Sequence, residues 1–547
     1  MKIAVEGCAH GELDVIYERI AQEEARGHFK VDLLICCGDF QSVRNASDLA
    51  CMAVPQKYKE MCSFHKYYSG EKRAPILTVF IGGNHEASNY LQELPYGGWV
   101  APGIYYMGYA GVVQFRGLRI AGLSGIYKGP DYLKGRHELP PYNNSTIRSV
   151  YHVRNLDVFR LRQLTGKIDI LITHDWPRGI YNYGDKNTLL RYKEFFREEV
   201  EQNTLGSRAG ELLLEDVRPA HWFAAHLHVR FTATVNHEEK DGKPASVTRF
   251  LALDKCLPKR KFLEIIDFPD GNSNKNYLDY DEEWLAILKS TNHLLSVVNS
   301  TQHMPGPGYS GRWDFRPTKE ELAKVKSAFN PDLRIPENFI RTAPVFNGRH
   351  RFDGVVPDPL KNPQTESFCD KLGVDDPVEV ILSSRAPAKK RVDVSVVEES
   401  ELDVTLSGTN EKTDISISTD SEDTGSPGLF FVDKQGSTPS STLNSTPRLP
   451  SFSRSTPNFN RSGNAFSPSS PFQSPPLTQR FRMTLPSPKQ DKQEEAVVSR
   501  GTLGPKIYPS SPLAIRYPAE SPKRECNSDV GPRQFKRRNA SLYDASE

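Results

Sequence analysis

The stretch VEGCAHGELD, residues 5–14, places a cysteine and a histidine directly after an apolar run. That run, MKIAVEG at residues 1–7, has the composition of a short buried strand. Side chains two positions apart on a strand point to the same face, so Cys8 and His10 are able to bind one metal ion together. The stretch therefore predicts a strand whose C-terminal end carries metal ligands, with a thiol where a site for a hard metal would carry a carboxylate.

The residues beyond this stretch alternate amphipathic and apolar segments. One buried helix face is predicted by the spacing of four side chains, Leu13, Ile16, Tyr17 and Ile20. Strands are predicted for VDLLICCGD, APILTVFIGGN, LRIAGLSG, IDILITHD and HWFAAHLHV, and closing strands for TRFLALDKC and KRKFLEIIDF. Strands that alternate with helices, each strand ending in a polar cluster, indicate a layered α/β fold with its site at the strand ends.

Length and composition restrict the class of protein. The length of 547 residues allows two or three domains, and the net charge of +2 commits no large surface to nucleic acid. Eight cysteines at irregular spacing favour reduced thiols over a disulfide framework. The N-terminus lacks an apolar stretch of signal-peptide length, and no run approaches the length of a membrane span. We therefore expect a soluble intracellular protein with no membrane partner.

Three regions of the chain differ in character. Residues 1–265 contain the predicted strands and the candidate site, and we assign the catalytic domain to them. Residues 270–385 contain two predicted helices and no catalytic pattern, so we expect a mostly helical region that packs on or extends the first domain. Residues 386–547 are rich in serine and proline and are predicted to be disordered. The short basic clusters PAKKRV and KRR in this tail favour a nuclear protein that can also shuttle to the cytoplasm.

Five polar clusters each follow a predicted strand, and glycines beside them leave room for ions and a phosphate. Taken singly, a histidine at a strand end is usually an ordinary hydrogen-bonding residue, and Asp39 alone could be a turn residue. Taken together and in this order, the clusters predict a metal site. They are GCAHGE, CCGDFQ, GGNHE, THDWP and AHLHV.

The series D-x-H, G-D, G-N-H-E, H and H-x-H, here with cysteine at the first aspartate, resembles the calcineurin-like metallophosphoesterases. This resemblance implies a two-sheet β-sandwich flanked by helices. Longer stretches resemble the RNA lariat debranching enzymes, for which the cysteine is itself typical: GCAHGELD, CCGDFQSVRN, GGNHEASN, ELPYGGWV, SGIYKG, YHVRN, THDWPRGIY and AHLHVRF. The resemblance is dense over residues 1–265 and thinner over 270–385, where it implies the C-terminal domain of those enzymes. It does not extend usefully into the tail.

The resemblance implies a set of ligands around two ions, with Asp39 bridging them. A carboxylate is able to bridge two cations, and neutral histidines with an amide oxygen complete such a site without over-neutralising it. The first ion would be held by Cys8, His10, Asp39 and His228. The second would be held by Asp39, Asn84, His174 and His226.

The thiol of Cys8 replaces a hard oxygen ligand by a softer sulfur. This exchange disfavours magnesium and favours Zn(II) or Fe(II), with Mn(II) able to substitute. A thiolate would preserve the negative charge, whereas a neutral thiol would weaken the site, so a one-ion and a two-ion enzyme both stay open. We expect Cys8 to tune the choice of metal and not to act as a nucleophile, because the neighbouring histidines are better used as ligands.

A pair of divalent metals suits phosphodiester hydrolysis, because it lowers the pKa of a bound water and holds the phosphate oxygens. The resemblance implies attack by water on the 2′–5′ linkage at the branchpoint of intron lariat RNA, which leaves linear RNA with a 5′-phosphate. His85 follows Asn84, is not needed as a ligand and is placed to protonate the leaving oxygen. We expect Glu86 and Asp175 to orient histidines from behind the ligands.

Residues 124–154 form a long insertion between two predicted strands, with five Lys or Arg against two acidic residues. Basic groups for phosphates and aromatic rings for stacking suit flexible or branched RNA, and the segment resembles the lariat-recognition loop of the family. A solvated loop whose tyrosines pack on the body is the alternative, and only the resemblance favours RNA. The candidate RNA-contacting residues are Tyr127, Lys128, Tyr132, Lys134, Arg136, Tyr142, Arg148, Tyr151 and Arg154.

Two other functions compete with debranching. A protein phosphatase or other phosphomonoesterase would carry GDxxDRG after the second strand, whereas this chain reads GDFQSVR. A non-catalytic scaffold would lose metal ligands, whereas this chain retains all of them. We therefore expect a nuclear hydrolase of mRNA processing and intron turnover. Branched intron lariat RNA is its expected partner, and spliceosome-associated proteins are candidate partners of the tail.

Overall fold

The first strand, β1 (Lys2–Glu6), contributes to two layers at once. Ile3 and Val5 pack with side chains of a second sheet, whereas Ala4 packs with helix α1 (Leu13–Gly27) on the opposite face. The period of two along a strand produces this division. The run is continuously apolar because both faces of the strand are covered.

The computed structural model describes residues 1–240, 242–269, 275–329, 333–346, 348 and 357–385. The tail 386–547, predicted to be disordered from its composition, lies outside these residues. Within the described ranges no helix has the length and apolar character that crossing a membrane requires. The seven cysteines in these ranges are all free, as their irregular spacing predicts.

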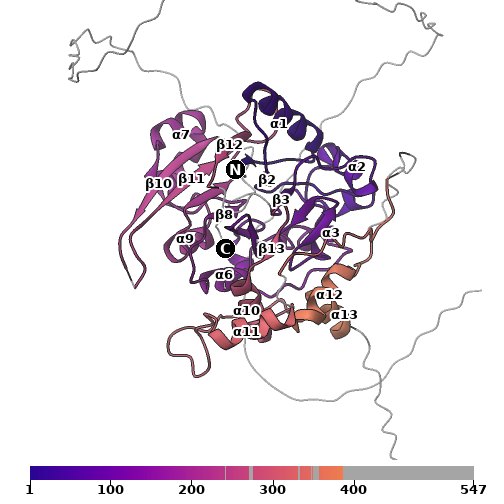
Figure 1. The fold of residues 1–547 in the computed structure, drawn as a ribbon, viewed down its shortest axis with the longest axis vertical. Helices are drawn as coiled ribbons and strands as arrows, with labels where there is room; N and C mark the ends of the chain where they lie inside the picture. The colour runs from indigo at the N-terminus through magenta and orange to yellow at the C-terminus, as the bar shows by residue number, and fades with distance from the viewer. Residues whose placement is uncertain (241, 270–274, 330–332, 347, 349–356, 386–547) are drawn as a thin grey trace, which may run out of the picture. The chain divides into compact units, whose positions relative to one another are not determined.

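In the described part of the chain, the strands form two mixed sheets (Figure 1). The strands that lead to the candidate site run parallel in each sheet, so their C-terminal ends meet at one edge. The first sheet has the order β12 (Leu263–Asp267), β1, β2 (Leu33–Cys36), β3 (Thr78–Phe80), β5 (Ile104–Tyr106), β4 (Gly98–Ala101). The second has the order β10 (Phe231–His237), β11 (Ser246–Ala252), β9 (His221–Ala224), β8 (Ile170–Thr173), β7 (Leu118–Leu123), β6 (Ala110–Phe115), β13 (Asp279–Tyr280).

Helices cover the outer faces of both sheets, and one buried cluster fills the space between the sheets. The α-helices after α1 are α2 (Phe64–Ser69), α3 (Ser88–Gln92), α4 (Gly129–Tyr132), α5 (Thr146–Ser149), α6 (Asn155–Arg162), α7 (Lys186–Tyr192), α8 (Arg197–Glu201), α9 (Arg208–Asp216), α10 (Glu282–Ser290), α11 (Lys319–Ala328), α12 (Pro363–Leu372) and α13 (Pro377–Arg385). Short 3₁₀ turns are η1 (Asp48–Cys51), η2 (Gln56–Tyr58), η3 (Ile180–Tyr183), η4 (Glu194–Phe196) and η5 (Asn292–Leu294). The two-sheet sandwich flanked by helices, implied by the family resemblance, is confirmed.

The predicted strands are all present, and α1 buries the four side chains that its spacing predicts. Strands β4, β5, β6, β10 and β13 are not predicted. Several of them have only two to four residues, too few to show a period of two. Strand β10 does alternate buried and exposed side chains, and this pattern could have revealed it.

The region after residue 275 extends the first domain. Strand β13 pairs with β6, and α10 contributes Trp284 and Ile287 to the buried cluster on the outer face of the second sheet. The α12 side chain of Gln364 accepts a hydrogen bond from the backbone N–H of Trp99 (2.8 Å) and donates one to its carbonyl (2.9 Å). The backbone groups of Trp99 on the edge strand β4 are therefore satisfied by α12, which leaves fewer of them open to another chain. Figure 1 shows α10 to α13 gathered at one end of this unit.

Because α10 belongs to the common core, a cavity there should destabilise the whole unit. Ile287 has no exposed surface, so Ile287→Ala should lower the free energy of unfolding by about 2–5 kcal/mol in urea titrations. The control is Ile340→Ala, at a position that is 45% exposed, and it should cost less than about 1 kcal/mol. Equal effects of the two substitutions would contradict a shared core.

Candidate metal centre

The candidate ligands lie on loops and not on strands, which corrects the geometry inferred from the sequence. Strand β1 ends at Glu6 and β9 at Ala224, so the rule of alternating strand faces does not apply to Cys8 and His10 or to His226 and His228. Several ligands instead adopt the left-handed backbone region that non-glycine residues rarely occupy. Their φ values are 46° for His10, 46° for Asp39, 60° for His226 and 50° for His228.

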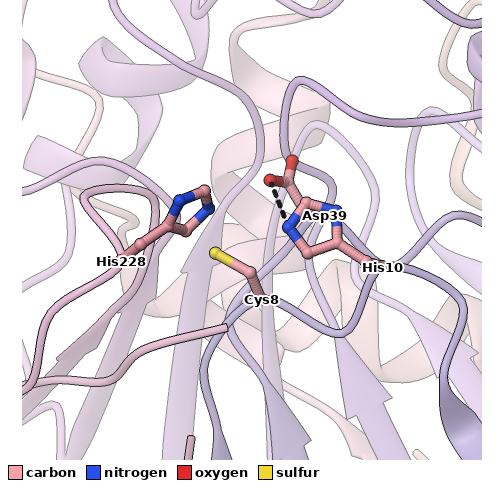
Figure 2. Close-up of side chains that lie close together, drawn as sticks. All are labelled: Cys8, His10, Asp39 and His228. Atoms are coloured by element: carbon pink, nitrogen blue, oxygen red, sulfur yellow. Dashed lines mark ion pairs between the residues drawn. The ribbon is translucent and has the colours of Figure 1, made fainter. Parts of the chain in front are cut away.

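Four side chains from three loops nevertheless converge on one point. The ligand atoms of Cys8, His10, Asp39 and His228 all lie within 4.8 Å of one another. Figure 2 shows the Cys8 sulfur between the His228 ring and the His10–Asp39 pair. Within that pair, His10 Nε2 lies 3.7 Å from Asp39 Oδ2. The structure therefore brings together the complete set that the resemblance implies for the first ion.

The set implied for the second ion also gathers around Asp39. His174 Nδ1 lies 2.8 Å from the Cys37 carbonyl oxygen, to which it donates, and Nε2 then faces Asp39 Oδ1 at 3.2 Å. The ring centroids of His174 and His226 are 4.9 Å apart. The backbone N–H of Asn84 donates to the same Asp39 oxygen at 2.9 Å. Asp39 thus has neighbours from both predicted sets, as a bridging carboxylate requires.

Two glycines make this close approach feasible. Gly38 has a φ of +102°, and a Cβ there would lie 2.4 Å from His174 Nδ1. A Cβ at Gly83 would lie 2.3 Å from Asp39 Oδ1 and 2.8 Å from His174 Nε2. Any side chain at either position would occupy the space that the ligands need.

Burial keeps three of the candidate ligand imidazoles neutral, those of His10, His226 and His228. It lowers the pKa of His10 to about 4 and that of His228 to about 3, although the Asp39 charge opposes the shift at both residues. Burial also holds the pKa of His226 well below its usual value. Near pH 7 these rings are uncharged and offer a lone pair to a metal.

The Asp39 carboxyl, unlike these imidazoles, is held in its charged form. Burial by itself would raise the pKa of its carboxyl, but the neighbouring His174, His85 and His10 outweigh burial and hold the pKa well below its ordinary value. The carboxyl is therefore charged at neutral pH. Reciprocally, the Asp39 charge outweighs burial at His174 and raises the pKa of that imidazole.

The Cys8 thiol is protonated near neutral pH in the absence of a metal. Burial raises its pKa, and the carboxylates of Asp39 and Glu6 raise it further. Its sulfur accepts a hydrogen bond from the backbone N–H of His226 at 3.2 Å. A metal that binds this sulfur as thiolate must displace a proton.

The residues present fit a divalent cation. Within the described ranges, His10 Nε2, His228 Nε2 and Asn84 Oδ1 are buried without a hydrogen-bond partner. Leaving such atoms unpaired costs free energy, and a coordinated cation would satisfy them. Nitrogen, oxygen and sulfur donors together match Zn(II) or Fe(II) better than magnesium. The site would draw on Cys8, His10, Asp39, Asn84, His174, His226 and His228.

Glu86 supports the site differently from the expectation that it would orient a histidine. Its carboxylate accepts hydrogen bonds from the backbone N–H groups of Phe40, Gln41 and Gly83, at 2.8, 2.9 and 2.8 Å. It therefore ties the loop after β2 to the loop after β3. Burial raises the pKa of Glu86 to about 7, against these hydrogen bonds.

Asp175 connects the centre to the 124–154 loop. Its carboxylate accepts hydrogen bonds from the backbone N–H of Trp176 (2.9 Å) and of Tyr127 (3.4 Å). Its charge also contributes, as a lesser cause, to the raised pKa of His174. Asp175 thus acts on its neighbour His174 through charge while it anchors the start of the loop.

His85 lies beside the ligand cluster and is only half buried. Its ring centroid is 5.0 Å from that of His10, and its backbone N–H donates to Asp39 Oδ1 at 2.9 Å. The backbone is therefore held by the central carboxylate, while part of the imidazole stays accessible. This is the geometry required of a proton donor that a substrate can reach.

The basic residues of the 124–154 loop are only partly available to a ligand. Arg136 and Arg154 are buried, and each donates to a carboxylate within the protein, Asp157 at 2.5 Å and Glu138 at 2.6 Å. Their charge is thus already compensated, which sequence composition could not reveal. Arg148 is exposed. The remaining candidates are half buried, namely Tyr127, Lys128, Tyr132, Lys134, Tyr142 and Tyr151.

Lys255 adjoins the centre without any sequence signal to mark it. It follows β11 and forms an isolated parallel bridge with Cys8, and the next N–H, of Cys256, donates to the Cys8 carbonyl at 3.0 Å. Its charge is among the lesser causes that lower the pKa of His10 and His228. Only the pairing of distant segments brings it there.

Two protein families match consecutive parts of the chain. The calcineurin-like phosphoesterase family matches residues 1–230, and the family described as lariat debranching enzyme, C-terminal domain, matches residues 245–377. The sandwich, the ligand cluster and the first match define a calcineurin-like phosphoesterase, a hydrolase that depends on divalent metal.

Curated relatives show to which family of phosphoesterases the chain belongs. Lariat debranching enzyme A of Xenopus laevis is 54% identical over 404 residues, covering 74% of this chain and 75% of the relative. The lariat debranching enzyme of Homo sapiens is 56% identical over 378 residues, covering 69% and 70%. That of Arabidopsis thaliana is 48% identical over 397 residues, covering 72% and 90%. The chain belongs to the lariat debranching enzyme family.

A methyl group at Gly83 should disrupt the centre without disrupting the fold. Its Cβ would collide with Asp39 and His174, so Gly83→Ala should weaken metal binding at least about tenfold, measured as metal content after reconstitution and dialysis. The control is Gly306→Ala, because nothing lies within 4 Å of a Cβ there. A full metal complement in Gly83→Ala, with unchanged circular dichroism, would contradict the geometry of the centre.

The raised thiol pKa of Cys8 makes metal affinity depend on pH. Protons compete with the metal for sulfur, so affinity should rise between about pH 6 and pH 8, by up to about tenfold per unit for one displaced proton. His10 and His228, with pKa values of about 4 and 3, are already deprotonated and add no slope. His174, whose pKa is raised because the Asp39 charge outweighs burial, also loses a proton to the metal and adds to the slope.

Cys8→Asp should reduce the slope of this profile and shift preference toward Mn(II) and Mg(II), measured by anaerobic competition with a chromogenic chelator. Cys62→Ser removes a half-buried thiol outside the ligand set and should keep the wild-type slope. An unchanged slope and metal preference in Cys8→Asp would exclude Cys8 as a ligand.

Proposed function

We propose that this chain hydrolyses the 2′–5′ phosphodiester linkage at the branchpoint of excised intron lariat RNA and so returns linear RNA for turnover. Relatives named lariat debranching enzymes, 54 to 56% identical over most of the chain, support this substrate. The observation that carries the proposal is the cluster of Cys8, His10, Asp39 and His228 in a member of that family, with Cys8 and Asp39 buried and both histidines half buried.

We assign Fe(II) or Zn(II) to the centre, one ion or two, with Mn(II) able to substitute, because of the thiol among the donors. When bound, the metal supplies a Lewis acid that lowers the pKa of water and offsets phosphate charge. The chain's own contribution is a rigid frame. Asp39 is held by two backbone N–H groups, and Glu86 fixes the two loops that carry Asp39 and Asn84.

His85 is the proposed general acid. Its imidazole lies beside the ligand cluster and is half buried, with part of its surface accessible, so the leaving 2′-oxygen of a bound branchpoint can come within hydrogen-bond reach. The proton passes from the imidazole to that oxygen as the P–O bond breaks, and the 2′-hydroxyl is restored. The neighbouring histidines His10, His174 and His228 are used as ligands and have buried Nε2 atoms, which leaves His85 for this role.

The 124–154 loop is the proposed recognition element for the branched RNA. The backbone N–H of Gly125 donates to the Gly82 carbonyl at 2.8 Å, and that of Tyr127 contacts Asp175, so the loop starts at the metal centre. Half-buried Tyr151 and exposed Arg148 offer a ring and a positive charge to nucleotides next to the cleaved bond. Arg136 and Arg154 support the loop from inside.

The cellular setting follows from the substrate. Introns are excised in the nucleus, and the basic clusters PAKKRV and KRR suit nuclear import, with shuttling compatible with the same signals. The serine- and proline-rich tail offers segments through which spliceosome-associated proteins could hold the enzyme near its substrate.

A direct test compares a synthetic 2′–5′ branched RNA with its linear 3′–5′ counterpart, using the chain reconstituted with Fe(II), Zn(II) or Mn(II). Selective cleavage of the branch is expected, and the rates rank the metals. Faster turnover of a phosphopeptide or of p-nitrophenyl phosphate than of branched RNA would favour a phosphomonoesterase instead.

The same assay tests the role of His85. His85→Ala should retain metal and RNA affinity while its kcat falls by about 10²- to 10⁴-fold, the usual contribution of general acid catalysis. His65→Ala, which changes a histidine outside the ligand set, is the control. A wild-type kcat in His85→Ala would exclude His85 as the proton donor.

A further inference from the structure

Exposed aromatic and apolar side chains gather on two segments beside the metal centre. Tyr192 at the end of α7 is 71% exposed, and Phe195 in η4 is 58% exposed. Leu257, in the loop between β11 and β12, is 41% exposed. Single exposed apolar residues are ordinary, but two aromatic rings three positions apart, held outward by a rigid turn, require a reason.

The turn that carries the two rings is well anchored. Phe196 and Leu189 are buried in the core cluster that also contains Leu227, between the ligands His226 and His228. Phe195 packs edge to face on Phe196 with ring centroids 4.6 Å apart. The exposed rings are therefore preorganised and would lose little entropy on meeting a ligand.

This surface adjoins the centre on the Cys8 and His228 side. Lys255 forms the bridge with Cys8, and the charges of Lys255 and Lys193 both act on the His228 imidazole. Lys193 in turn interacts electrostatically with Asp254, Lys255 and Arg260, so the two segments face each other. The 124–154 loop, by contrast, starts on the Asn84 and His174 side, at Gly82 and Asp175.

The charge of these segments is positive. Residues 191–199 and 254–261 contain seven Lys or Arg and four Asp or Glu, a net of +3, whereas the whole chain has only +2. Arg191 and Lys193 lie over the rings of Tyr192 and Phe195, at 5.7 and 5.6 Å from their centroids. Rings for stacking with flanking cations for phosphates are what single-stranded nucleic acid binds.

We propose that Tyr192 and Phe195, with Lys193 and Lys255, form a stacking platform for one single-stranded arm of the branched RNA. The inference rests on the proposed function and extends it. A branchpoint has three arms, and the 124–154 loop serves nucleotides on one side of the centre. The platform holds an arm that leaves on the other side, so that recognition requires a branch and not merely a 2′–5′ bond.

The test uses the full-length wild-type chain and the double variant Tyr192→Ala/Phe195→Ala. Substrates are a branched RNA with three long arms and three versions in each of which one arm is cut to a single nucleotide. The double variant should show a KM raised at least about tenfold on the long-armed RNA, with kcat within twofold of wild type. On the one version whose shortened arm would otherwise reach the platform, the double variant and the wild type should have the same KM.

Two control proteins separate stacking from a structural effect. Tyr192→Phe/Phe195→Tyr keeps both rings and should restore the wild-type KM. Tyr309→Ala removes another highly exposed ring, 60% exposed, from the region after α10 and should leave KM unchanged on every substrate. An increase in KM by the same factor on all four RNAs would mean that the two side chains act only on the protein's structure, and it would overturn the platform.

Affinity supplies a readout that does not need catalysis. Fluorescence anisotropy with the metal-free chain should show weaker binding of the long-armed RNA by the double variant, at least about tenfold. Wild-type affinity and KM in the double variant, while wild type still cuts the branch, would overturn the platform and leave the proposed function standing. If wild type cuts no branched RNA, the proposed function fails, and the anisotropy result alone decides whether this surface binds single strands.

Discussion

The buried carboxylate of Asp39 is the constraint on which the rest of the centre depends. It accepts hydrogen bonds from two backbone N–H groups in the loop after β3. It also lies close to the side chains of His174, which follows a strand of the second sheet, and of His10, in the loop after β1. These contacts form only if the C-terminal ends of the parallel strands in both sheets lie at the same edge of the sandwich. The left-handed backbone at Asp39 itself stores strain that the surrounding hydrogen bonds hold in place.

Burial and neighbouring charges together set the protonation states of the candidate ligands. Desolvation lowers the pKa of His10 and His228, so they are neutral lone-pair donors, while the surrounding imidazoles keep Asp39 charged. The same desolvation raises the thiol pKa of Cys8. Occupancy of the centre by a metal is thereby linked to proton release at sulfur, which a carboxylate at that position would not require at neutral pH. We propose that a thiol at this position makes the site both metal-selective and pH-sensitive.

The region after residue 275 takes part in positioning the centre, although its described residues supply no candidate ligand. Arg44, on the loop that follows Asp39, is fully buried and pairs with Asp48 and Glu93, and its guanidinium also donates to the Thr342 hydroxyl at 2.9 Å. A buried, multiply paired arginine fixes the loop more firmly than a surface contact would. This explains why the two matched families cover consecutive parts of one unit and not two independent domains.

Periodicity and spacing were sufficient for the elements that lead to the site: α1 buries its four predicted side chains, and β1, β2, β3, β8 and β9 precede the five polar clusters as expected. Residue type was sufficient to predict a divalent-metal site, because cysteine, histidine and aspartate side chains follow successive strands. What no local pattern contains is which side chains are compensated inside the protein and which distant segments meet. Arg136 and Arg154 look like phosphate contacts in the sequence yet neutralise buried carboxylates, and Lys255 looks ordinary yet borders Cys8. Those outcomes are set by long-range packing and burial, which exist only in the folded chain.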